Sequence, residues 1–290
     1  MKGEGKAIAH GAVGILNAFA TGKGGALSVD LWTRARVTLR EGPGAISGLV
    51  STDPNESSKL STEVVRKTLR HFGYEEKVSG VVITSSNIPT AVGLKSSSAA
   101  ANAVALATAS AMGEDPDDDE LLEIGVDASI ECGVSLTGAY DYSFASYYGG
   151  AVLTDNEHRT VQKRLKVPDD IQLLIFVPPR KRYTGSLDRS GFGPIRRISE
   201  LAYDEAACGR IWDAMTLNGL ALSSVLGEDP RPALSAIRVG ALGAGLSGKG
   251  PAIVAAVERD NAKRVRDVFA KFEGQVIETR PNLSRAEIET

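Results

Sequence analysis

The sequence of 290 residues contains only two cysteines and three histidines. Cys132 and Cys208 lie far apart and in no C-x-x-C pair, which favours free thiols in a reducing compartment over a disulfide. The histidines, His10, His71 and His158, are scattered along the chain. A histidine-based metal site needs its ligands grouped, so no such site is expected.

An excess of charge of one sign is also missing, because the net charge is −3. The chain therefore lacks the basic surplus of proteins whose main partner is nucleic acid or an anionic membrane. Every long apolar stretch is interrupted by Gly, Ser or a charged residue, so no transmembrane helix is expected. The first residues do not have the pattern of a secretory signal. These absences favour a cytoplasmic protein.

What the sequence does contain is an ordinary globular composition, 42% hydrophobic and 24% charged. A chain of this length can bury a sizeable core in one large domain or two medium ones. Helical and strand patterns alternate without a strict βαβ repeat, which favours an α+β fold. The polar stretch 155–166 indicates a boundary, so we expect two domains, residues 1–155 and 156–290, that meet at an active-site cleft.

Hydrophobic periodicity and turn residues place the expected secondary structure. Strand patterns occupy residues 26–39, 78–84, 151–154, 171–177, 251–257 and 275–279. Helical patterns occupy residues 58–72, 99–112, a segment after the acidic run 115–120, 198–226, 230–242 and 261–271.

The most informative local feature is the segment 89–100, which follows a predicted strand and precedes a predicted helix. A helix N-terminus presents unpaired N–H groups and a partial positive charge, so it binds phosphate well. Gly93 lets the backbone approach an anion closely, Lys95 adds positive charge, and the hydroxyls at 96–98 can contact phosphate or Mg²⁺. A serine-capped, alanine-rich structural helix is the alternative interpretation.

A second glycine-rich segment, residues 243–250, superficially fits two nucleotide-binding patterns. It reads G-x-G-x-x-G, but it does not follow the first strand of a βαβ unit. It nearly fits the Walker A pattern, but Gly250 stands where that pattern needs Ser or Thr, and a predicted strand follows instead of a helix. Neither label applies. The segment is either a loop that contacts a ligand through its backbone or a tight turn.

Two carboxylates and one lysine are further candidates. We expect Glu131 at a helix end and Asp141 in a loop with glycine on both sides. Beside a nucleotide, one carboxylate would hold Mg²⁺ and the other would orient or deprotonate an attacking hydroxyl. Solvated surface acids are the alternative for both. Lys6 precedes an apolar stretch and is otherwise an exposed lysine near the N-terminus.

The basic turn at residues 180–182 follows a predicted strand. Its arginines could grip the carboxylate of an acidic substrate, although a solvated turn is the simpler interpretation. We expect most of the aromatic side chains between residues 140 and 148 to pack in the core.

Taken in order, these segments resemble the three motifs of the GHMP kinase superfamily, which includes galactokinases, homoserine kinases and mevalonate kinases. Residues 5–8 and 22–26 look like the two ends of the first motif. Residues 89–100 are similar to the second motif, P-x-x-x-G-L-G-S-S-A-A, and residues 243–257 to the third. Within the superfamily, the stretches G-L-K-S-S-S-A and T-G-A-Y-D look most like the archaeal-type shikimate kinases.

The resemblance implies transfer of a phosphoryl group from ATP, with Mg²⁺, to the 3-hydroxyl of shikimate, a step towards chorismate and the aromatic amino acids. It implies that Asp141 is the base or orients the hydroxyl, and that Lys6 lies near the acceptor. It implies that Ser97 and Glu131 contact Mg²⁺. The residues that it implies for nucleotide binding are Pro89, Ala91, Val92, Gly93, Leu94, Lys95, Ser96, Ser97, Ser98 and Ala99.

The chain departs from the family pattern at three places. Lys95 stands where the second motif has Gly, the segment between Lys6 and Lys23 contains no G-E-H, and Lys249 lies within the third motif. A kinase of the homoserine or mevalonate type, a non-catalytic GHMP-like binding protein and a structural protein without a ligand stay open as alternatives. The sequence assigns no residue to the nucleotide base or the shikimate carboxylate, and it gives no oligomeric state.

Overall fold

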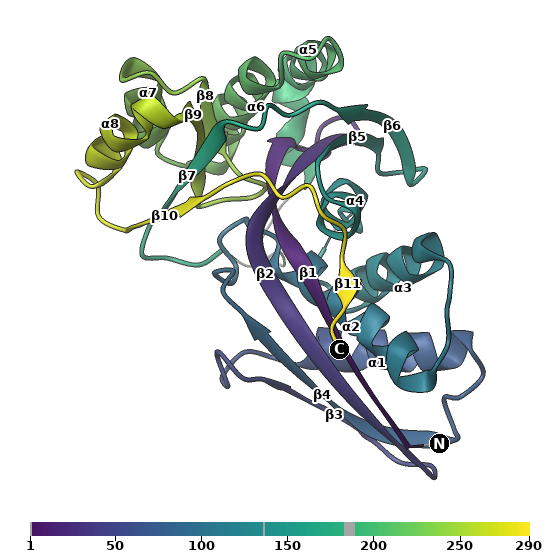
Figure 1. The fold of residues 1–290 in the computed structure, drawn as a ribbon. Helices are drawn as coiled ribbons and strands as arrows, with labels where there is room; N and C mark the ends of the chain where they lie inside the picture. Colours follow the sequence, from purple (N-terminus) through teal and green to yellow (C-terminus); the bar gives the residue numbers. More distant parts are fainter. Residues whose placement is uncertain (1, 136, 183–188) are drawn as a thin grey trace.

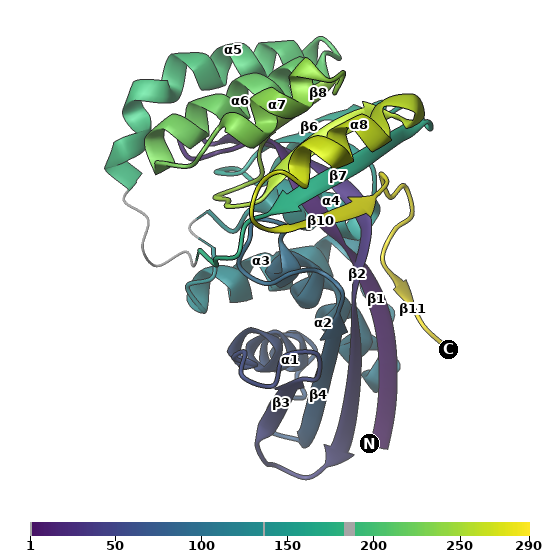
Figure 2. The same ribbon diagram turned by 90° about the vertical axis from the view of Figure 1, so that its left-hand side faces the viewer.

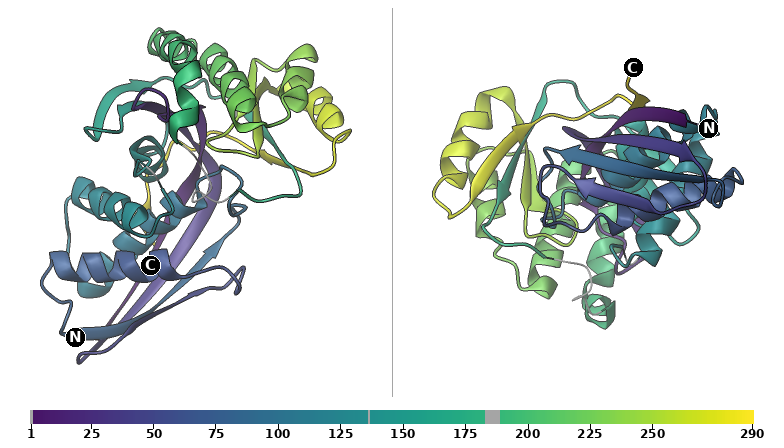
Figure 3. Two further views of the ribbon diagram at one scale, coloured as in Figure 1. Left: turned by 180° about the vertical axis from the view of Figure 1, so that it is seen from behind. Right: turned by 90° about the horizontal axis from the view of Figure 1, so that it is seen from below.

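The computed structural model describes residues 2–135, 137–182 and 189–290. The described residues form two β-sheets with helices packed on them (Figure 1). A seven-stranded sheet contains most strands of the N-terminal half, and a four-stranded sheet belongs to the C-terminal half. Seen from below, the two halves lie side by side (Figure 3). This arrangement confirms the α+β class expected from the sequence.

A long antiparallel hairpin forms the centre of the first sheet. Its strands, β1 (Lys2–Leu16) and β2 (Lys23–Glu41), extend through much of the molecule (Figure 2). At one end β2 pairs with β4 (Val78–Ser86), which runs parallel to β3 (Ile46–Val50). At the other end β2 pairs with β5 (Ala151–Asp155).

The burial of β2 changes along its length. In its second half, buried residues alternate with more exposed ones, as in a strand with one face covered. Residues 24–29 of its first half are all buried. This part of the hairpin is therefore enclosed between the two halves of the molecule.

The helices of the N-terminal half are α1 (Lys59–His71), α2 (Ser96–Met112), α3 (Asp118–Glu131) and α4 (Tyr140–Tyr148). They pack on one face of the first sheet, with α2 against β1 and β2 (Figure 1). Alanine and other small residues dominate α2, and nearly all of its residues are buried. Small side chains bring the helix close to the sheet.

Gly5 of β1 is one of the points of close approach between the strand and the helix. A Cβ atom added at Gly5 would lie 2.1 Å from the carbonyl oxygen of Ala107 in α2. No side chain fits at this point unless strand and helix move apart.

The second sheet is antiparallel, in the order β10-β7-β9-β8. Its strands are β7 (Ile171–Val177), β8 (Gly243–Leu246), β9 (Ile253–Glu258) and β10 (Gln275–Thr279). Its helices are α5 (Arg196–Ala207), α6 (Ile211–Leu226), α7 (Arg231–Arg238) and α8 (Arg259–Phe269), with a 3₁₀-helix at Arg189–Ile195 before them. After β10 the chain returns to the first sheet, where β11 (Glu287–Ile288) pairs with β1 (Figure 1).

Several expected boundaries differ from the observed ones. The single helix expected at 198–226 is wrong, because Gly209, with φ of +91°, separates α5 from α6. The glycine-rich segment begins as β8, so its turn joins two strands of the second sheet. Asp141 lies in the first turn of α4 and not in a loop.

The polar stretch that suggested a domain boundary contains a strand. β6 (Thr160–Leu165) pairs with β5 and so belongs to the first sheet. The division of the chain after residue 155 stays a prediction. Among the described residues, no helix is both long and apolar enough to cross a membrane.

The tight contact between β1 and α2 predicts that Gly5→Ala destabilises the fold. We expect a loss of about 1–3 kcal/mol in the free energy of unfolding, because the added methyl group overpacks the interface. Urea denaturation measures it. Gly193→Ala is the matched control, since a Cβ there meets nothing within 4 Å. Equal stability of the two variants would contradict the packing argument.

Candidate active site

The N-terminus of α2 presents free backbone donors. Lys95 precedes the helix in the left-handed region, with φ of +57°, and no side chain caps the first turn. The serines at 96–98 are therefore the first helical residues and not its caps. Ser98 is buried, and its hydroxyl lies 3.3 Å from that of Ser143. Ser96 and Ser97 are partly exposed and line a cavity. This helix end suits an anion.

That cavity, which we call the serine cavity, has a volume of about 340 Å³. Its walls include the apolar side chains of Val50, Leu60 and Ile88 and the hydroxyls of Ser96 and Ser97. The volume lies within the range of small-molecule sites, and apolar walls with a polar end suit a nucleotide.

A second, narrower cavity, the aspartate cavity, has a volume of about 20 Å³. Asp141 and Tyr142 of α4 line it together with Asn17, Lys95 and Asn156. Its size is close to that of one water molecule. A larger ligand needs this cavity to widen.

Asp141 is buried, with 1% of its surface exposed. Its Oδ1 accepts a hydrogen bond of 2.9 Å from the side-chain amide of Asn156, whose Oδ1 in turn accepts one of 3.2 Å from the Asp141 backbone. Its Oδ2 has no hydrogen-bond partner among the described residues. Burial raises the pKa of Asp141, and the Lys95 ammonium and the Asn156 hydrogen bond oppose this shift only in part.

Lys95, which is partly buried, is the counter-charge of Asp141. Its ammonium lies 4.2 Å from the centre of the Tyr142 ring, a cation–π geometry. Burial lowers the pKa of Lys95, while the Asp141 carboxylate opposes the shift. Both charges thus lose solvation, and each is held by the attraction of the other.

The two glycine-rich segments interlock beside these cavities. The Ser247 hydroxyl donates to the carbonyl oxygen of Gly93 (2.9 Å) and accepts from the backbone N–H of Gly14 (3.0 Å). Gly93 has φ of +96°, and a Cβ there would lie 2.2 Å from the Ser247 carbonyl oxygen. Only glycine fits this junction, so the turn after β8 fixes the loop before α2.

The sequence-predicted nucleotide residues divide into two groups. Ala91, Ser96 and Ser97 line the serine cavity, and Lys95 lines the aspartate cavity. The others line neither cavity: Pro89, Val92, Gly93, Leu94, Ser98 and Ala99. Val92 and Leu94 are buried, and their carbonyl oxygens accept hydrogen bonds from Ala252 and Ala12. They shape the loop without lining either cavity.

Two predicted residues lie outside both cavities. Lys6 is on β1, about a third exposed, with its ammonium 3.8 Å from Glu4. Glu131 is at the end of α3, exposed, and pairs with Lys67 at 2.6 Å. The structure therefore brings Ser97 and Asp141 to neighbouring cavities, but it does not bring Lys6 or Glu131 to either.

Sequence reasoning missed three residues that line these cavities. Asn17 and Asn156 carry no local motif, and Asn156 reaches Asp141 only because α4 and β5 fold together. Lys249 lines both cavities, and its place inside a glycine-rich segment was a visible signal. No group of three or more His, Cys, Asp or Glu residues that could hold a metal occurs within the described part of the chain.

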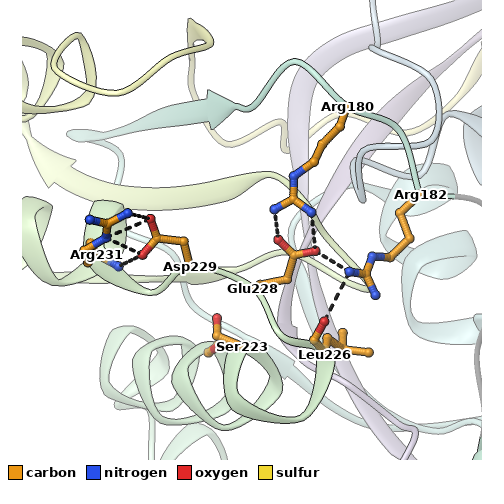
Figure 4. A network of polar contacts seen from close by, with 8 residues as sticks. Arg180, Arg182, Ser223, Leu226, Glu228, Asp229 and Arg231 are labelled. Carbon is orange, nitrogen blue, oxygen red and sulfur yellow. Dashed lines mark hydrogen bonds and ion pairs between the residues drawn. The ribbon is translucent and has the colours of Figure 1, made fainter.

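The basic turn at 180–182 is built into the fold (Figure 4). Arg180 and Arg182 both bind the carboxylate of Glu228, whose side chain is only 2% exposed. Arg182 also donates to the carbonyl oxygen of Leu226, and its backbone N–H donates to Ala91. The turn is therefore not an open carboxylate grip, although the side chains of Arg180 and Lys181 are 48% and 45% exposed. It ties the loop before α2 to the segment after α6.

Known proteins resemble this chain along most of its length. The sequence model described as the GHMP kinases N terminal domain matches residues 59–150, and the one described as GHMP kinases C terminal matches residues 210–274. The shikimate kinase of Methanosarcina acetivorans is 41% identical over 281 residues, 96% of this chain and 94% of that protein. The shikimate kinase of Pyrococcus furiosus is 38% identical over 283 residues, 96% and 99% of the two chains.

Solved structures of lower identity share the fold. The homoserine kinase from Cytophaga hutchinsonii has a TM-score of 0.77 at 18% identity and covers 100% of this chain and 98% of its own. The mevalonate kinase of Methanococcus jannaschii has a TM-score of 0.75 at 18% identity, with 95% and 98% covered. The two-domain architecture expected from the sequence is thus shared along the whole chain.

The buried carboxylate predicts a pH-dependent stability difference. Because the folded state raises the pKa of Asp141, the stability that this group contributes at low pH is lost as the pH rises through the folded pKa. Asp141→Asn removes the ionisable group and also the counter-charge of Lys95. We therefore expect its stability relative to the unchanged chain to rise by about 1–2 kcal/mol between pH 5 and pH 8. Thermal unfolding at both pH values measures this.

The control is Asp267→Asn, which changes an exposed carboxylate. It should leave the melting temperature unchanged at both pH values. A stability difference between Asp141→Asn and the unchanged chain that stays constant with pH would contradict the assignment of the effect to ionisation of Asp141.

Proposed function

This chain belongs to the GHMP kinases and, within them, to the shikimate kinases of archaea, and from that premise we propose that it transfers the γ-phosphoryl group of ATP to the 3-hydroxyl of shikimate. Identities of 37–41% to curated shikimate kinases over nearly the whole chain support this acceptor. The proposed setting is the cytoplasm, with shikimate and ATP as small-molecule partners.

The observation that carries the proposal is the position of Asp141. Its Oδ2 is buried, has no hydrogen-bond partner among the described residues, and lines a cavity next to an open helix N-terminus. An acceptor hydroxyl supplies the missing donor. Asp141 would orient that hydroxyl and take its proton, and the raised pKa favours acceptance of the proton during transfer.

The serine cavity is the proposed ATP site. The free N–H groups at the start of α2 would hold the phosphates, and the apolar walls formed by Val50, Leu60 and Ile88 would contact the base. The γ-phosphoryl transition state is loose, so positioning and charge neutralisation provide most of the catalysis. The loop before α2, fixed by Ser247, supplies that positioning.

Mg²⁺, when bound, would supply positive charge against the phosphates. Ser97 fits this ion, because its hydroxyl lines the serine cavity at the helix end. Glu131 would reach it only after leaving Lys67. Mg²⁺ commonly keeps several waters and binds few protein ligands, so one hydroxyl together with phosphate oxygens is a sufficient set.

The test of the reaction is an acceptor panel. Purified protein with Mg·ATP is offered shikimate, homoserine or mevalonate, and ADP release is followed. We expect turnover with shikimate and none above background with the other two. Turnover with homoserine or mevalonate alone would assign the chain to another GHMP kinase, and ATP binding without turnover on any acceptor would indicate a binding protein.

Asp141→Asn should lower kcat for shikimate by about 100-fold or more, because a positioned base contributes about 10²–10⁴-fold. The KM for ATP should stay within threefold, since Asp141 does not line the serine cavity. Steady-state kinetics separate the two constants, with Asp267→Asn as the control. An equal loss of ATP affinity would make Asp141 a structural residue.

Ser97→Ala should raise the Mg²⁺ concentration needed for half-maximal rate by about tenfold, because the hydroxyl is a proposed metal contact. Titration of Mg²⁺ at fixed ATP measures it. Glu131→Gln, tested beside it, decides the second proposed ligand. A raised Mg²⁺ requirement assigns the carboxylate to the metal, and an unchanged one leaves Glu131 as the partner of Lys67. An unchanged requirement in Ser97→Ala would refute its metal role.

A further inference from the structure

The serine cavity and the aspartate cavity share two lining residues, Val134 and Lys249. Of these, only Lys249 carries a charge. A phosphoryl group that moves from a nucleotide in the first cavity to a hydroxyl in the second must pass the boundary between them. Lys249 is therefore the cation that lies on the path of transfer.

The backbone of Lys249 is fixed on both sides. Before it, Ser247 is bonded to Gly93 and Gly14 through its hydroxyl. After it, the N–H of Gly250 donates to the Ser247 carbonyl oxygen (2.8 Å), and the N–H of Ala252 donates to Val92 (3.0 Å). The turn is thus attached to the same loop that begins α2. A lysine on such a turn keeps its place relative to the helix N-terminus.

Two like charges, Lys95 and Arg182, lie near Lys249. Burial lowers the pKa of Lys249 to about 8, and the like charges of Lys95 and Arg182 add to this shift. Lys95 faces the Asp141 carboxylate, and Arg182 is bound to Glu228. The charged form of Lys249 is stabilised most when a group with several negative charges lies at the boundary between the cavities. A phosphoryl group in transfer is such a group.

The sequence resemblance implied a different lysine, Lys6, near the acceptor. Lys6 is on the exposed part of β1 beside Glu4 and lines neither cavity. Among the described residues, the lysines that line either cavity are Lys95 and Lys249. Only Lys249 also reaches the serine cavity.

We propose that Lys249 is a catalytic residue that contacts the γ-phosphoryl group during its transfer between the two cavities. This inference rests on the proposed kinase function and names a residue of the same site. The bond between the γ-phosphorus and the β,γ-bridging oxygen breaks, and its electron pair stays on ADP. The acceptor oxygen forms the new bond to phosphorus, and its proton passes to Asp141. The ammonium of Lys249 stabilises the equatorial oxygens throughout.

The test compares Lys249→Met with Lys263→Met, an exposed lysine of α8. We expect Lys249→Met to lower kcat for shikimate by about 100-fold or more, as does removal of one group that stabilises transition-state charge. The Kd for Mg·ATP, measured by calorimetry, should change less than tenfold. Lys249→Arg should retain more activity than Lys249→Met because it keeps the charge. Lys263→Met should match the unchanged chain.

The outcomes separate this inference from the proposed function. If the unchanged chain phosphorylates shikimate and Lys249→Met keeps kcat within threefold, the role of Lys249 is wrong and the kinase assignment stands. If kcat is retained but Kd for Mg·ATP rises more than tenfold, Lys249 binds the nucleotide without contributing to the transfer, which also overturns the inference. An unchanged chain without turnover on any acceptor refutes the proposed function itself. If Lys249→Met melts at a lower temperature, Lys249→Gln, which keeps a polar side chain, decides the same question.

Discussion

The contact on which the site depends is the pair of hydrogen bonds made by the buried hydroxyl of Ser247. It joins the turn after β8 to Gly14 of β1 and to Gly93 in the loop before α2, so three distant parts of the sequence meet at one oxygen atom. A buried hydroxyl with both bonds made is stable, and a loss of either partner would leave a buried polar group unpaired. Because Gly93 has no side chain, the two loops approach closely enough for these bonds to form. The serine cavity and the aspartate cavity therefore have a fixed relation to each other.

Because the two cavities are held in place, the opposite charges of Asp141 and Lys95 lie together beside a cavity that holds about one water molecule. Asp141 is buried and Lys95 is partly buried. Loss of solvation raises the pKa of Asp141 and lowers that of Lys95, so it favours the neutral form of each. Asn156 satisfies one carboxylate oxygen and leaves the other without a partner among the described residues. Such an arrangement weakens the folded state. It favours ligands that donate a hydrogen bond to the unpartnered carboxylate oxygen and that place negative charge near the cations. Of the proposed substrates, the alcohol supplies the hydrogen-bond donor and the polyphosphate supplies the negative charge.

The sequence predicted the features that depend on local pattern. The helix expected at 99–112 from its small residues and preceding loop is present, but it begins at Ser96, and the serines expected as possible caps are its first residues. The break at Gly209 was missed because the apolar pattern continues on both sides of it. The positions of Lys6 and Glu131 could not be read from sequence, since a strand and a helix end each offer several directions that only tertiary packing selects. Asn156 was invisible for the same reason, because its link to Asp141 exists only once α4 and β5 lie together.

Backbone strain points to the same region as the charges. Among the described residues, the non-glycine residues with positive φ are Ala91, Lys95, Ala139 and Arg159. The first of these lines the serine cavity, and the next two line the aspartate cavity. A left-handed conformation at a non-glycine residue costs about 1–2 kcal/mol, so three such residues at one site persist only where the surroundings impose them. At position 95 a glycine would adopt this conformation freely, but it would leave Asp141 without its counter-charge. Lysine at this position therefore costs backbone strain but supplies the positive charge opposite Asp141. The helix N-terminus, the Asp141 carboxylate and the turn that carries Lys249 thus act together electrostatically.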